Sequence, residues 1–88
     1  MSEGDENLAR LMAELGELLS AVDDDRYDLT HEAKRRLTAI GQLIHEIGGP
    51  ALMSEVMLDV ASSPSSRTES RREGALDRAW NGIGGWLA

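Results

Sequence analysis

The residues best suited to chemistry are two histidines, His31 and His45, each of which is followed by a glutamate. A helical zinc motif of the form H-E-x-x-H needs a second histidine four residues after the first, but Arg35 and Gly49 occupy those places. The two histidines are fourteen residues apart, which is about 21 Å along one helix at 1.5 Å per residue. They cannot share an ion within one chain, so we expect two histidines at the edge of a helix surface and no metal site.

A second candidate for chemistry is the acidic run at residues 23–28. Asp23, Asp25 and Tyr27 fall at positions 1, 3 and 5 of a twelve-residue calcium loop. However, Asp28 stands where that loop needs its turn glycine, and Lys34 stands where it needs a bidentate glutamate. A lysine there would repel the cation, so the pattern predicts a solvated acidic turn.

Other reactive groups are missing from the sequence. The chain has 88 residues and no cysteine, which excludes disulfides, thiolate metal sites and a catalytic thiol. It also lacks a glycine-rich phosphate loop with its lysine and the serine elbow of the α/β-hydrolases. We therefore predict that the chain is not an enzyme and that it takes no cofactor and no small-molecule substrate.

Charge narrows the range of partners. The net charge is −7, and residues 1–28 hold nine acidic side chains against two basic ones. Such a field disfavours nucleic acid and anionic lipid. No apolar run approaches the ~18 residues that cross a membrane, and the acidic first residues are unlike a secretory or mitochondrial presequence. We expect a cytoplasmic protein with no nucleic-acid or membrane partner.

The elements that carry these residues are predicted to be helices. Leu, Ala, Met and Glu are frequent and aromatic residues make up only 3% of the chain, a composition typical of aliphatic helix packing. Asp5 is the predicted N-cap of a helix over 5–22. The apolar stripe of that helix is Leu8, Leu11, Met12, Leu15, Leu18, Leu19 and Val22. Small residues flank the stripe and would let another helix approach: Ala9, Ala13, Gly16 and Ser20.

Two further helices are expected at 30–48 and 51–61. Thr30 is the predicted N-cap of the first of these, and the pair Gly48-Gly49 is a typical C-cap. Pro50 suits the first turn of the next helix. In the helix predicted at 51–61, Leu52, Val56 and Val60 form the apolar stripe. Leu58 faces away from that stripe, which favours contact with a partner.

The last third of the chain is predicted to be loosely attached. Residues 62–68 are rich in serine and predict a flexible linker, and residues 69–88 predict a C-terminal helix with a tryptophan tail. The expected fold is an all-α, small three-helix bundle over residues 1–61 plus a tethered fourth helix. Trp80, Ile83 and Trp86 either close the open end of the chain's own bundle or anchor to another molecule.

One resemblance rests on residues 79–86, which read Ala-Trp-Asn-Gly-Ile-Gly-Gly-Trp, together with Leu37–Gly41 and Ile47–Met53. This pattern resembles a group of small bacterial all-α proteins of uncharacterised function and covers roughly the C-terminal half of the chain. The resemblance implies a bacterial origin and contributes no activity.

We expect a protein–protein interaction module that uses apolar helix faces and the tryptophan tail. The expected partner is a protein, and a second copy of the chain, forming a homodimer, is one candidate. The expected contact residues are Trp80, Ile83, Trp86, Leu58 and Leu15. The alternative is an acidic regulator, like an antitoxin or a nucleic-acid mimic, that blocks a basic site on its partner through residues 23–28. Salt distinguishes the two, because a complex held by charge weakens sharply as ionic strength rises.

Overall fold

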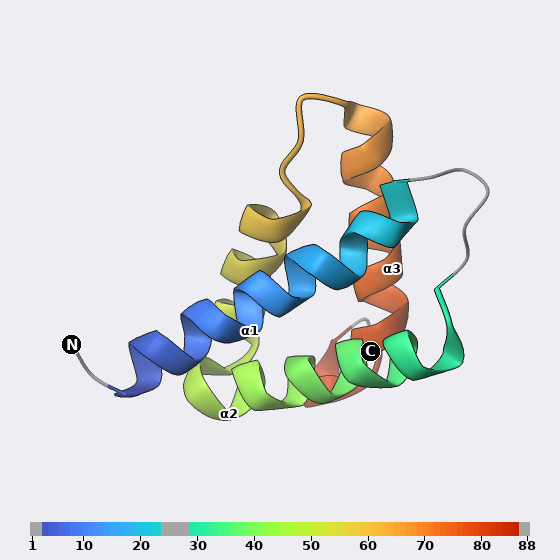
Figure 1. Cartoon of the computed structure of the whole chain (residues 1–88). Coiled ribbons are helices and arrows are strands. Elements are labelled where there is room, and N and C mark those ends of the chain that lie inside the picture. Colours follow the sequence, from blue (N-terminus) through green and yellow to red (C-terminus); the bar gives the residue numbers. More distant parts are fainter. Residues whose placement is uncertain (1–2, 24–28, 87–88) are drawn as a thin grey trace.

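A computed structural model describes residues 3–23 and 29–86, and every regular element in those two ranges is helical (Figure 1). The order along the chain is α1 (Glu3–Ser20), the 3₁₀ turn η1 (Ala21–Asp23), α2 (His31–Ala61), α3 (Ser66–Trp80) and the 3₁₀ turn η2 (Ile83–Gly85). The predicted all-α class is confirmed. Because α1 already begins at Glu3, Asp5 lies inside the helix and is not its N-cap.

Helix α2 is bent at the predicted break. Thr30 caps its N-terminus, accepting a hydrogen bond from the Ala33 amide on its side-chain oxygen at 3.1 Å. Gly49 interrupts the helix with φ 72° and ψ −168°, and Pro50 starts the next turn. The helices predicted at 30–48 and 51–61 are thus two arms of one element, called here the first arm (31–48) and the second arm (50–61). The described residues therefore form three helices, and a separate fourth helix is not among them.

Helix α3 is packed into the fold instead of being tethered beside it. It begins at Ser66, capped by Ser65, so that only residues 62–65 separate it from α2. The Arg72 guanidinium donates a hydrogen bond to the Val60 carbonyl at 3.2 Å and so ties α3 to the end of α2. The predicted linker was too long because the serines that suggested flexibility include the cap of the helix.

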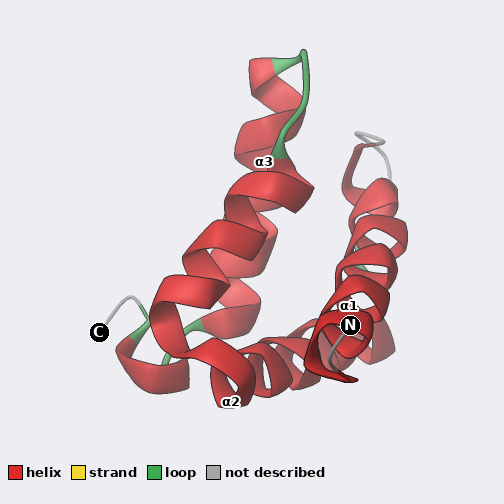
Figure 2. Ribbon diagram, turned by 90° about the vertical axis from the view of Figure 1, so that its left-hand side faces the viewer, coloured by secondary structure: helices red, strands yellow, loops and turns green. Residues whose placement is uncertain are grey.

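The core lies where α2 meets the other two helices. In Figure 2, α1 and α3 stand on opposite sides of the fold, and the first arm of α2 runs between them. The central cluster is aliphatic apart from one tryptophan, as composition predicted; its fully buried members are Leu15, Leu19, Leu37, Ile40, Ile44, Met53, Leu76 and Trp80. Within the two described ranges, no helix has the length and apolarity needed to cross a membrane.

Candidate functional site

The glycine-rich tail forms a closed turn. Gly82, Gly84 and Gly85 all have positive φ, at 91°, 56° and 86°, a conformation that other residues rarely adopt. The Gly82 amide donates to the Trp86 carbonyl at 2.9 Å, and the Trp86 amide donates to the Ile83 carbonyl at 2.9 Å. These two bonds bring the chain back toward the end of α3.

The closed turn brings the two tryptophan rings together. Their centroids are 5.3 Å apart and the rings are nearly perpendicular, at 81°, which is a favourable edge-to-face arrangement. The Trp80 indole N–H donates to the Leu37 carbonyl at 3.0 Å, and the Trp86 indole N–H donates to Asp77 Oδ1 at 3.1 Å. Both indoles therefore have hydrogen-bond partners within this chain.

A glycine in α2 makes room for the first of these rings. A Cβ atom at Gly41 would come closer than 3.0 Å to Cδ1 and Nε1 of Trp80. The ring therefore lies directly on the backbone of α2, at the position where that helix has no side chain.

The structure buries some of the predicted partner-binding residues and leaves others exposed. Leu15 and Trp80 are fully buried in the core, so they offer no surface to a partner, and their assignment as contact residues is corrected. Trp86 and Ile83 are half-buried against the same core. The tail was predicted either to close the chain's own bundle or to anchor to another molecule. In the structure it packs against the chain's own bundle. Leu58 is 66% exposed and remains available for contact.

The residues considered for metal chemistry are not brought together. His31 is exposed at the start of α2, whereas His45 is half-buried, and its ring lies against the backbone at Gly84. Among the residues that the structure describes, no group of three or more potential ligands could hold a metal ion. The acidic run lies outside the described residues apart from Asp23, the last residue of η1.

One surface feature is a groove of about 450 Å³ between α1 and the first arm of α2, called here the α1–α2 groove. Its apolar centre includes Leu43 and Ile47, which are 40% and 45% exposed. The full lining is Asn7, Arg10, Leu11, Glu14, Arg36, Leu43, Glu46 and Ile47.

An ion pair spans this groove. The Arg36 guanidinium donates to both carboxylate oxygens of Glu14, the Nη2 bond measuring 2.9 Å. This hydrogen bonding holds the pKa of Glu14 below its ordinary value. The pair joins α1 to α2 and fixes one wall of the groove.

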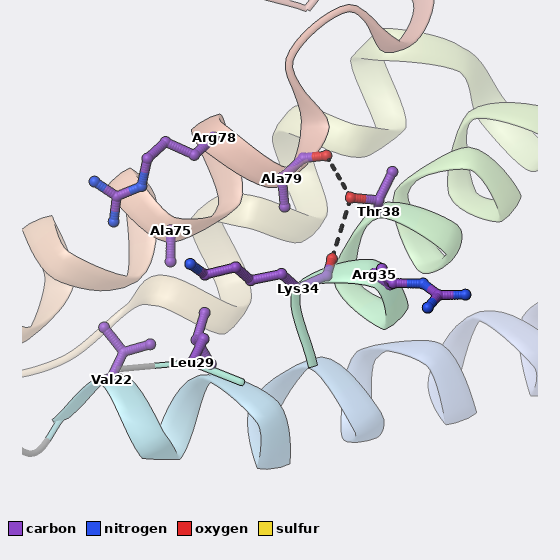
Figure 3. Close-up of a pocket in the computed structure, with 8 residues that line it drawn as sticks. All are labelled: Val22, Leu29, Lys34, Arg35, Thr38, Ala75, Arg78 and Ala79. Atoms are coloured by element: carbon purple, nitrogen blue, oxygen red, sulfur yellow. Dashed lines mark hydrogen bonds between the residues drawn. The ribbon is translucent and has the colours of Figure 1, made fainter. Parts of the chain in front are cut away.

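A second feature, called here the basic pocket, has a volume of about 540 Å³ and lies where η1 and the start of α2 meet the end of α3 (Figure 3). Its lining is Val22, Leu29, Lys34, Arg35, Thr38, Ala75, Arg78 and Ala79. The Thr38 hydroxyl lies 2.8 Å from the Ala79 carbonyl and 3.1 Å from the Lys34 carbonyl, and it holds the two helices together at the back of the pocket.

None of the residues that line either pocket is among the contact residues predicted from the sequence. The sequence does carry a signal for the groove, because Leu43 lies beside the apolar face that Leu37, Ile40 and Ile44 form on the same helix. Positions at the edge of such a face are the first to stay exposed. No comparable signal exists for the basic pocket, since its cations come from the start of one helix and the end of another.

Comparison of the chain with protein families, curated proteins and solved structures gives no match. The expected bacterial origin therefore stays a prediction. A function for the chain has to be argued from the geometry of its surface.

Proposed function

We propose that this chain is a non-enzymatic protein–protein interaction module that binds a second copy of itself through the α1–α2 groove. The observation that supports this most is the exposure of Leu43 and Ile47, two of the three large apolar side chains left exposed among the described residues. They lie together in one groove. Adjacent exposed apolar side chains bounded by charged residues are typical of an interaction surface.

The charges of the groove favour a second copy as the occupant. Glu14 and Arg36 already pair with each other, which leaves Arg10 on the α1 side and Glu46 on the α2 side. A two-fold axis that runs along the groove would bring the α1 side of each copy onto the α2 side of the other, and so the Arg10 of each copy toward the Glu46 of the other. A two-fold interface must carry its own complement, and the presence of a basic and an acidic side chain on opposite sides of the groove supports this arrangement.

Sedimentation equilibrium tests the dimer. We expect the wild-type chain to dimerise at micromolar concentration and Ile47→Glu to be monomeric, because a carboxylate would be buried in the centre of the interface. Leu58→Glu is the matched control: it makes the same chemical change at an exposed leucine outside the groove, and it should leave the dimer intact. A wild-type chain that sediments at 9.6 kDa at all concentrations would refute the proposal.

A charge exchange tests the geometry. Arg10→Glu and Glu46→Arg should each weaken the dimer, since each places like charges opposite one another. The double variant should recover much of the lost affinity. If the double variant is no tighter than either single variant, the two-fold arrangement is wrong even if a dimer exists.

The remaining features of the proposal follow from composition. We propose that this is a cytoplasmic protein. We also propose that its partners are neither nucleic acid nor membrane, because a net charge of −7 disfavours association with polyanions. The alternative, an acidic regulator acting through residues 23–28, has no described geometry in its favour. The affinity of the proposed dimer should fall only modestly between 50 and 500 mM salt, because salt screens its Arg10–Glu46 contacts but not its apolar centre, whereas a complex held by the acidic run should weaken strongly.

A further inference from the structure

The basic pocket is lined by positively charged side chains that form no ion pair or hydrogen bond with the described residues. Among the described residues, four basic side chains make no hydrogen bond or ion pair: Arg10, Lys34, Arg35 and Arg78. Three of these four line the basic pocket. In a chain whose net charge is −7, the described lining of this cavity has three cations and no acidic side chain.

The arrangement of the side chains separates a polar from an apolar side. In Figure 3, Lys34 extends across the pocket between Arg78 and Leu29, whereas the Arg35 guanidinium points away from them. Val22 and Leu29 lie below Lys34, on the side opposite Arg78. The pocket therefore offers charge along one edge and aliphatic surface along the other.

We infer that the basic pocket binds a small amphipathic anion, a carboxylate on an alkyl or aryl body. The carboxylate would lie between Lys34 and Arg78, where charge-assisted hydrogen bonds are strongest. The apolar body would cover Val22, Leu29 and Ala75. The volume of about 540 Å³ falls in the usual range for small-molecule sites. This site is separate from the α1–α2 groove, with which it shares no lining residue.

Decanoate is the probe, titrated below its micelle concentration into ¹⁵N-labelled chain and followed by amide shifts. We expect saturable shifts at Thr38, Ala75 and Ala79. The double variant Lys34→Gln/Arg78→Gln should bind about tenfold more weakly or worse, since both charged donors are lost. Arg67→Gln is the control: it removes an exposed cation that lines neither pocket, and it should bind as the wild type does.

Related probes separate the parts of the inference. Affinity should rise by up to about fourfold per added CH₂ from hexanoate to decanoate, while decanol and decyltrimethylammonium should each bind at least tenfold more weakly than decanoate. The inference is overturned if decanol binds as well as decanoate, if the double variant binds equally well, or if the shifts map elsewhere. Stronger binding of a poly-aspartate peptide would also overturn it, by assigning the pocket to an acidic protein segment.

The proposed dimer and the proposed binding site can be tested separately, because they lie on different surfaces. Ile47→Glu lies outside the basic pocket and should bind decanoate normally whatever its oligomeric state. If this variant loses both dimerisation and decanoate binding while it stays folded by circular dichroism, the site is not the one assigned.

Discussion

Replacing Gly41 with alanine should destabilise the protein, although alanine is the better helix former. The new Cβ would come closer than 3.0 Å to Cδ1 and Nε1 of Trp80, a ring that is fully buried. The ring cannot withdraw without cost, because its N–H is bonded to Leu37 and its other contacts include Trp86. Either the ring or the helix must move.

Three contributions determine how much Gly41→Ala changes the free energy of unfolding. Overpacking a close-packed core costs about 1–3 kcal/mol, and stretching the Trp80–Leu37 hydrogen bond costs up to about 1 kcal/mol more. Exchanging glycine for alanine inside a helix returns about 1 kcal/mol. The net loss in the free energy of unfolding is therefore about 1–2 kcal/mol, which lowers the Tm of a domain of this size by roughly 4–16 °C.

Urea denaturation followed by circular dichroism measures this loss. Gly16→Ala is the matched control, because Gly16 is also inside a helix but has no atom near its would-be Cβ; it should stabilise the protein by about 0.5–1 kcal/mol. In a Trp80→Phe background, the smaller ring should reduce the cost of Gly41→Ala. The reasoning fails if Gly41→Ala stabilises the protein as Gly16→Ala does.

Three further predictions concern the tail and the ion pair. Gly84→Ala should cost about 1–2 kcal/mol in urea denaturation, because φ is 56° and the Cβ would overlap the His45 ring; an unchanged midpoint would contradict the closed turn. Trp86→Ala should cost about 2–4 kcal/mol, since a half-buried indole and its edge-to-face contact are lost, and a loss under 1 kcal/mol would mean that the tail is not packed. Because the folded pKa of Glu14 lies below its ordinary value of 4.5, its pair with Arg36 stabilises the fold above that value, and the effect is lost as the pH falls through the folded pKa. Thermal melts of the wild type and Glu14→Gln should therefore differ at pH 7 and converge as the pH is lowered below 4.5; a constant difference would contradict this.

Helix caps and bends could be predicted from the sequence, because each depends on one or two neighbouring residues. The cap at Thr30 needs only a hydroxyl beside the first turn of a helix, and the bend at Gly49 needs only a glycine followed by Pro50. The start of α3 was misplaced for the opposite reason. A serine-rich segment is equally compatible with a linker and with the cap that Ser65 provides, and only packing of the helix decides between them.

The features that define the surface could not be predicted, because they depend on residues far apart in the chain. Nothing near Gly41 indicates that a tryptophan thirty-nine positions later will lie on its backbone. The basic pocket is similar, since Lys34 and Arg78 lie at opposite ends of different helices. Sequence periodicity shows which face of a helix is apolar, but it does not show which other element covers that face.

The position of Trp80 has a consequence for how the chain is made. A ribosome completes α1 and both arms of α2 before it adds this residue, and the contact of its indole with Leu37 spans 43 positions. Until then the faces of α2 that surround the ring have no cover, so a nascent or prematurely terminated chain displays an apolar surface to chaperones and proteases. Folding can be completed only after α3 and the glycine turn have left the exit tunnel.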